Sequence, residues 1–237
     1  MSISVGDAGG ENPPRPTDAP GAVVPGLFFH PPTPLPRGRH NVPREQVDAA
    51  QNERLLIALT ELVAARGYTA TSVGDIVERA QVSRVAFYRS FADKQSCALA
   101  AYARFIDVLL ANIAARLDPD QGLAEFVDSC LRAYLEPMQD DPIVGRAFQV
   151  EIDAMGAPAR DRRRQALQLF ADTLAAHHRH LIDTGRAGGT PLPPSAYLGV
   201  VYAVRQLTSD ALETTEPVDL LESVPELSRW LLRLLDA

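Results

Sequence analysis

The feature that most constrains the fold is the helical spacing of apolar residues, which continues from about residue 44 to the end of the 237-residue chain. In the first such stretch, Leu55, Leu59, Leu62 and Val63 would form one apolar stripe on a helix. No run alternates apolar and polar residues as a half-buried strand does, and no internal repeat stands out. The pattern therefore predicts an all-α protein of about nine helices.

Capping residues, glycines and prolines predict where these helices begin and end. Gly67 would end the first helix, Thr71 or Ser72 would cap a short second one, and Asp118 and Pro119 would stop the fourth. The helices expected from these signals cover about 45–66, 72–80, 83–91, 93–117, 121–138, 142–155, 158–183, 195–214 and 218–235.

The first 43 residues differ from the rest in composition. They contain ten prolines and six glycines, with three acidic and three basic residues. Such a segment buries too little apolar surface to offset the entropy that it loses on ordering. We therefore expect a disordered tail over residues 1–43, a first folded domain over residues 44–93 and a second over residues 94–237.

The net charge of −7 is unevenly distributed. Residues 44–104 carry eight basic and seven acidic residues, whereas residues 105–237 carry 12 basic and 20 acidic ones. The acidity therefore disfavours nucleic-acid binding by the C-terminal part, and it leaves room for a local basic surface in the middle of the chain. Among 23 basic residues, Lys94 is the only lysine.

The sequence carries no sign of export or of membrane insertion. No run of 18 apolar residues is present, and the N-terminus lacks the charged and apolar regions of a signal peptide. Two cysteines, Cys97 and Cys130, cannot build a disulfide framework. We expect a cytoplasmic protein without membrane contact.

The segment from Gly67 to Lys94 carries the strongest functional signal. It predicts two short helices joined by a three-residue turn, which is the size of a helix-turn-helix motif. The outward face of the second of these helices holds no acidic residue and mixes arginines, hydroxyls and an aromatic ring, a mixture suited to phosphate oxygens and base edges. By spacing alone, an ordinary solvated helix explains the pattern as well as DNA binding does.

Residues 54–104 resemble the DNA-binding domain of the TetR/AcrR family of one-component transcriptional regulators. The resemblance covers RLLIALTELVAARGY, TSVGDIVERA and VSRVAFYRSFADK, where aromatic, capping and cationic positions agree in order and spacing. Two positions depart from the family pattern, because Gln81 replaces the usual glycine of the turn and Gln95 replaces the usual glutamate. Gln81 would have to adopt a turn conformation that is unusual for a non-glycine residue.

The resemblance implies a DNA-binding site in the second and third helices. Its base-facing residues would be Arg84, Val85 and Ala86, with Arg84 reading guanine through O6 and N7. Helix starts with free amides would add phosphate contacts. The remaining residues expected to hold phosphates or cap these helices are Thr71, Ser72, Ser83, Tyr88, Arg89, Ser90 and Lys94.

The resemblance also implies that the rest of the chain is a helical effector-binding and dimerisation domain. The homodimer, which would bind double-stranded operator DNA, would form through residues 195–235, although these helices could instead cover the core of a monomer. A small apolar or aromatic effector would bind among large side chains, and the candidates are Phe105, Phe126, Tyr134, Met138, Phe148, Met155, Phe170 and Tyr202.

Other residues give weaker signals. His177, His178 and His180 cluster near a helix end, but no acid or thiol stands at metal-ligand spacing, so we expect no metal and no cofactor. Arg37, Arg39, His40 and Arg44 could form an arm in the minor groove or belong to a spacer. No catalytic motif is present, so we expect no enzyme. A helical ligand-binding or adaptor protein without DNA binding is the alternative.

Overall fold

The computed structural model describes residues 21–31, 43–118, 120–214 and 218–235. Within these residues the chain is helical and contains no β-strand. The elements are α1 (Arg44–Arg66), α2 (Val73–Ala80), α3 (Arg84–Ser90), α4 (Lys94–Arg116), α5 (Leu123–Asp140), α6 (Pro142–Gln149), the 3₁₀ helix η1 (Glu151–Met155), α7 (Ala157–Asp183), α8 (Pro194–Glu213), the 3₁₀ helix η2 (Leu220–Ser223) and α9 (Val224–Leu235). The all-α prediction and the number of α-helices are confirmed for this part of the chain.

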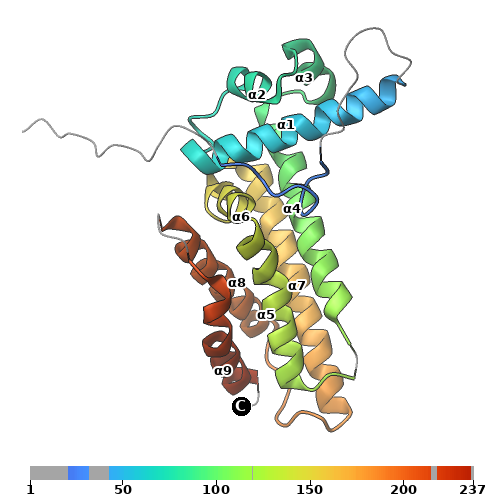
Figure 1. Ribbon diagram of the computed structural model, residues 1–237. Helices are drawn as coiled ribbons and strands as arrows, with labels where there is room; N and C mark the ends of the chain where they lie inside the picture. Colours follow the sequence, from blue (N-terminus) through green and yellow to red (C-terminus); the bar gives the residue numbers. More distant parts are fainter. Residues whose placement is uncertain (1–20, 32–42, 119, 215–217, 236–237) are drawn as a thin grey trace, which may run out of the picture.

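The helices form a long body with a small cluster at one end (Figure 1). Helix α1 lies across that end, with α2 and α3 on its outer side and α4 and α6 beneath it. Helices α4, α5 and α7 run along the body, and α8 and α9 form one flank of it. The α2–α3 pair is thereby presented at the end of the molecule, away from α9.

Helix α4 explains the one apolar segment that is long enough to cross a membrane. Among the described residues, only Lys94–Arg116 meets that test by length and composition. In the structure this helix packs against α1, α5 and α7 and buries Phe105, Ile106 and Leu109, among other residues. Its composition therefore follows from its place in the core.

Residues 21–31 form an ordered strap, which differs from the expected tail over residues 1–43. Val23, Phe28 and Phe29 are buried, and the Phe28 ring lies 5.5 Å from the Phe105 ring between centroids. A turn at Gly26, with a φ of 89°, lets the two phenylalanines face the core. The rest of that range, residues 1–20 and 32–42, lies outside the described residues.

Backbone N–H groups of the strap form hydrogen bonds with α1 and with the cap of α6. The Val23 N–H donates to Glu61 of α1 at 3.1 Å, and the Val24 N–H donates to the buried carboxylate of Asp141, which caps α6, at 2.7 Å. Burial raises the pKa of Asp141, while the backbone N–H groups that donate hydrogen bonds to its carboxylate act in the opposite direction. The strap thus joins α1 to α6 through Glu61, which also pairs with Arg79, and through Asp141, which also accepts from the Val144 N–H.

We expect Phe28→Ala to lower the free energy of unfolding by about 3 kcal/mol, because it removes a fully buried ring and leaves a cavity against Phe105. Urea denaturation followed by circular dichroism measures this change. Val24→Ala is the matched control, since Val24 belongs to the same strap but its side chain is exposed. Equal, small effects of the two substitutions would show that the strap does not contribute to the core.

Candidate nucleic-acid interface and internal cavity

Side-chain caps fix the helix-turn-helix at both of its helix starts. The Ser72 hydroxyl accepts from the Asp75 N–H, and the Asp75 carboxylate accepts in return from the Ser72 N–H at 2.8 Å. Hydrogen bonds that the Ser72 hydroxyl and N–H donate to this carboxylate, together with the ion pair with Arg66, lower the pKa of Asp75 to about 2. Ser83 caps α3 in the same way by accepting from the Ala86 N–H at 3.1 Å.

The turn between α2 and α3 has the conformation expected from its unusual residue. Gln81 takes the left-handed region, with φ 52° and ψ 46°, and it is the only non-glycine residue with positive φ among those described. The Val82 N–H then donates to the Val77 carbonyl at 3.0 Å, which closes the turn. The prediction of an unusual backbone at Gln81 is confirmed.

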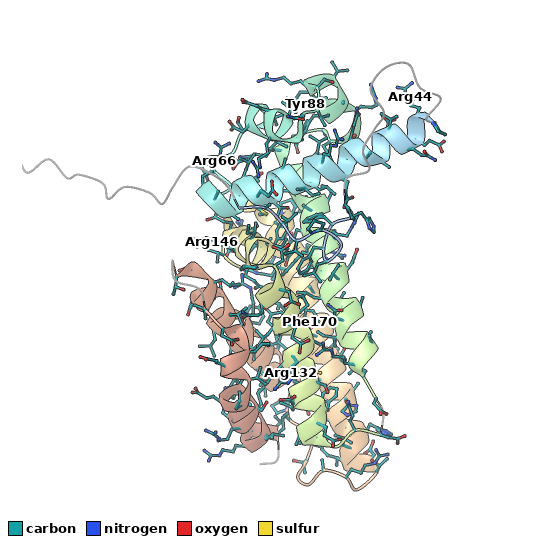
Figure 2. All side chains as sticks on the ribbon, in the orientation of Figure 1. Arg44, Arg66, Tyr88, Arg132, Arg146 and Phe170 are labelled. Atoms are coloured by element: carbon teal, nitrogen blue, oxygen red, sulfur yellow. The ribbon has the colours of Figure 1, made fainter. Side chains whose placement is uncertain are left out.

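One face of α3 is open to solvent and holds most of the predicted base-facing and phosphate-binding side chains. Val85 is 72% exposed and Tyr88 is 56% exposed, and Ser83, Arg84 and Arg89 are exposed beside them. Figure 2 shows Tyr88 at the end of the molecule, on the outer side of α2 and α3. Helix α3 has no acidic residue, so this face offers donors and apolar groups to an anionic partner.

Two side chains of this face already have neighbours that orient them. Arg89 donates to Asp48 of α1 at 2.9 Å. The guanidinium group of Arg84 lies against Gly74 at the start of α2, where a Cβ atom would approach its Nη2 to 3.1 Å. A glycine at this position therefore gives Arg84 room to extend over the N-terminus of α2.

Three predicted contact residues point elsewhere. Ala86 is 6% exposed and packs inward, because α3 needs a small residue where it crosses the domain core. Thr71 is also buried, and its hydroxyl donates to the Gly67 carbonyl at 2.9 Å. The Ser90 hydroxyl donates to the Ala86 carbonyl at 3.4 Å within its own helix. Thr71 and Ser72 are the two residues expected at the start of α2, and of these Ser72 is exposed.

Lys94 lies at the base of the helix-turn-helix, half-buried. Its ammonium group donates to the carbonyls of Tyr68 and Thr71, at 2.8 and 2.7 Å, and lies 4.0 Å from the centre of the Tyr68 ring. Burial lowers the pKa of Lys94, while the charge of Asp75 acts in the opposite direction. Two of the three N–H groups therefore hold the turn after α1, and one is left for another acceptor.

Contacts that the sequence did not suggest connect this end to the body. The Tyr68 N–H donates to Glu151 of η1 at 2.9 Å, and the Gln95 side chain donates to the Met155 carbonyl at 2.9 Å. Gln95 is one of the two residues that depart from the family pattern, and here it links α4 to η1. Both bonds join residues more than 50 positions apart, which local sequence patterns cannot reveal.

An apolar cavity of about 100 Å³ lies inside the helical body, between α4, α5, α7, α8 and α9. Figure 2 shows Phe170, one of its lining residues, in the middle of the body and far along it from Tyr88. All but two of the lining residues are apolar or aromatic, and they are Ile113, Val127, Cys130, Leu131, Tyr134, Leu167, Phe170, Thr173, Leu174, Val200, Val201, Val204, Arg205, Leu231 and Leu235.

The structure brings two of the eight predicted pocket residues, Tyr134 and Phe170, to this cavity. Five others pack in the core away from it, namely Phe105, Phe126, Met138, Phe148 and Met155. Tyr202 lies on the outer surface of α8 and is 38% exposed. Large side chains fill space in a core, so the cavity is lined mainly by valines and leucines between them.

His177, His178 and the two cysteines are partly or fully buried, whereas His180 is exposed. His178 is buried with its Nδ1 2.8 Å from the Tyr197 hydroxyl, and the His177 ring stacks on Phe126. Among the described residues, no group of three or more potential ligands could hold a metal ion. Burial raises the pKa of the Cys97 and Cys130 thiols to about 12, so neither is a reactive thiolate.

The α8–α9 flank keeps an exposed apolar surface. Several apolar residues of α8 and α9 are buried, including Val204, Leu212, Leu227 and Leu231. The large apolar residues of these two helices that are exposed are Tyr202, Leu207 and Leu234.

Part of the chain is similar in sequence to proteins of one known family. Residues 55–101 match the profile described as bacterial regulatory proteins, tetR family. This stretch contains the end of α1, all of α2 and α3, and the start of α4. One curated relative, the HTH-type transcriptional activator FasR of Mycolicibacterium smegmatis, is 27% identical over 105 residues. That alignment covers 44% of this chain and 46% of the relative, so the matched region is less than half of either protein.

Solved structures share the fold over most of the chain. The fatty acid degradation regulator FadR of Bacillus halodurans superimposes with a TM-score of 0.67 at 15% identity, covering 77% of this chain and 94% of that one. The transcriptional regulator FadR of Bacillus subtilis, in complex with stearoyl-CoA, gives a TM-score of 0.62 at 16% identity, covering 78% and 97%. At these identities the likeness concerns the fold.

We expect Lys94→Ala to lower the free energy of unfolding by about 1–2 kcal/mol, because the Tyr68 and Thr71 carbonyls lose a charged donor. Urea denaturation of the full chain measures it. Arg132→Ala is the control, since Arg132 forms only a solvent-exposed pair with Asp128 and should change stability by less than about 0.5 kcal/mol. A Lys94→Ala protein as stable as this control would contradict the positioning role of Lys94.

Proposed function

We propose that this chain, a member of the TetR family, is a one-component transcriptional regulator that binds a pseudo-palindromic operator as a homodimer and responds to a small-molecule effector. The observation that carries the proposal is the exposed, acid-free face of α3 within the stretch that matches the family. The protein would act in the cytoplasm and would catalyse no reaction.

In the proposed complex, α3 lies in the major groove. Arg84 donates to guanine and Val85 meets a thymine methyl group. Ser72, Tyr88, Arg89 and the remaining N–H of Lys94 contact phosphates, and these contacts set the register on the duplex. Of the predicted arm, Arg37, Arg39 and His40 lie outside the described residues, whereas Arg44 is the first residue of α1 and lies 3.8 Å from Asp48. The arm stays a prediction, as does the division at residue 93.

Dimerisation would use the apolar surface of Tyr202, Leu207 and Leu234 within the predicted range of residues 195–235. A single helix-turn-helix contacts one half-site, whereas a two-fold dimer contacts two, and this symmetry matches a pseudo-palindrome. The exposure of Leu207 on α8 and Leu234 on α9 supports this surface, because exposed apolar groups can mark interaction sites.

The effector would bind in the cavity between α5, α7, α8 and α9. Its lining suits an apolar molecule, and the stearoyl-CoA complex of the Bacillus subtilis neighbour supports an effector with an acyl chain and a role in fatty acid metabolism. Effector and operator would favour different arrangements of the same helices, with a coupling free energy of about 1–3 kcal/mol.

We propose repression as the outcome, which is usual in the family, whereas the relative FasR is named an activator. Repression would result if the bound dimer blocks transcription until the effector weakens its hold on DNA. Transcript levels in a deletion strain decide the direction. Levels of the target gene that rise after deletion support repression, and levels that fall show activation.

We expect Arg84→Ala to remove the preference at one base position of the operator, at a cost of about 1–3 kcal/mol in DNA binding. Selection of binding sites from a random duplex library, followed by gel-shift titration of the selected DNA, measures both. Arg229→Ala removes an exposed arginine from α9 and is the control. An unchanged base preference would exclude Arg84 from base recognition, and no DNA binding by the wild-type chain at any salt concentration would support the adaptor alternative.

We expect Leu207→Glu to convert the dimer to a monomer at micromolar concentration, because it places a charge on an apolar residue that is 52% exposed. Size-exclusion chromatography with light scattering gives the mass. Val85→Glu places the same charge on an exposed apolar residue of α3 and should leave the dimer intact. A wild-type chain that is monomeric, or a Leu207→Glu protein that stays dimeric, would contradict this surface.

A further inference from the structure

Arg205 gives the cavity a charge that its apolar lining does not explain. It is the only charged residue among those that line the cavity, and its side chain lies on α8 with only 8% of the residue exposed. Among the described residues, no carboxylate lies within 4.0 Å of its guanidinium nitrogens. Buried arginines are ordinarily paired, because removing an unpaired charge from water is costly.

The hydrogen bonds of Arg205 leave this charge uncompensated. Its Nη2 donates to the Gln149 carbonyl at 2.6 Å, and its Nη1 lies 3.5 Å from the side-chain oxygen of Gln206. Both acceptors are neutral. Arginine remains protonated in proteins, so a positive charge persists at the cavity wall.

We propose that Arg205 receives the carboxylate of an amphipathic effector, an aliphatic monocarboxylate whose apolar chain occupies the cavity. This inference rests on the proposed function, since it names the effector class of the same cavity. The guanidinium group can hold a carboxylate through two parallel hydrogen bonds, and the valines and leucines of α5, α7 and α8 surround the chain.

Tyr134 provides a second donor beside the arginine. Its side chain lines the same cavity from α5. Burial raises the pKa of Tyr134, while the nearby charge of Arg205 acts in the opposite direction. The phenol therefore keeps its proton, and its O–H can donate a hydrogen bond to the carboxylate oxygen that Arg205 binds.

Arg205 also connects the cavity to the DNA-binding end. The Gln149 carbonyl ends α6, and it accepts from both Arg205 and the Ser209 hydroxyl, the latter at 3.1 Å. Helix α6 packs against α1, and its cap Asp141 holds the strap at Val24. A carboxylate that draws Arg205 toward itself competes with the Gln149 carbonyl and thereby acts on α6 and α1.

The test compares three ligands of equal chain length on the full chain: decanoate, decanol and decanoyl-CoA. Trp230 is the only tryptophan and lies on α9 beside the lining residue Leu231, so its fluorescence reports binding. We expect wild-type protein to bind decanoate about tenfold or more tightly than decanol, which lacks the charge. Decanoyl-CoA has a thioester in place of the carboxylate and should bind more weakly than decanoate.

Variants then assign the preference to Arg205. Arg205→Gln should bind decanoate and decanol equally, and Arg205→Lys should restore a preference for the acid. Arg132→Gln removes an exposed arginine from α5 and should behave as wild type. If Arg205→Gln also loses decanol binding, the cavity itself is altered, and the comparison between wild type and Arg205→Lys decides instead.

Four results would overturn the inference: no binding of decanoate, equal binding of decanoate and decanol by wild type, binding of decanoyl-CoA but not of the acid, or an acid preference that persists in Arg205→Gln. Gel-shift titration of the same wild-type protein separates this failure from failure of the proposed function. A chain that binds operator DNA but shows no acid preference keeps the proposed function and loses this effector class.

Discussion

The burial of α1 from two sides is the constraint on which the rest of the structure depends. Leu55, Leu59 and Val63 are fully buried where α2 and α3 pack on one side of the helix and α4 and α6 on the other. Close-packed interiors transmit displacement, because a core does not deform continuously. Helix α3, which we propose lies against DNA, is therefore coupled in position to the helices that lead to the cavity.

The helix starts and the turn of the helix-turn-helix could be predicted from the sequence, whereas three of its predicted contact residues, Thr71, Ala86 and Ser90, point elsewhere. Ser72, Asp75 and Ser83 are capping residues whose partners stand three positions away, so local sequence determines where α2 and α3 begin. The left-handed Gln81 followed from its place in the turn. Most other helix boundaries agree to within a few residues because prolines and glycines mark them. Two expected helices were wrong in extent, since 142–155 divides into α6 and the 3₁₀ helix η1, and 218–235 begins with the 3₁₀ helix η2.

The remaining features depend on contacts between distant residues, which a single sequence does not reveal. The segment rich in proline and glycine still contributes Val23, Phe28 and Phe29 to the core. These residues pack there because α4 offers the Phe105 ring and α1 offers the Glu61 carboxylate as partners. The cavity lies where valines and leucines of four helices meet incompletely, so aromatic residues were a poor guide to it. Nothing in the local sequence distinguishes Arg205 from other helical arginines, because only tertiary packing buries it.

The proposed regulation requires that effector and operator DNA bind to different states of one coupled structure. The most direct measurement is a complete binding cycle with the full chain: affinity for operator DNA with and without saturating decanoate, and affinity for decanoate with and without saturating DNA. We expect each ligand to lower the affinity of the chain for the other ligand by the same factor, about 5- to 150-fold. Decanoate that binds the DNA-bound chain as tightly as the free chain would contradict the claim.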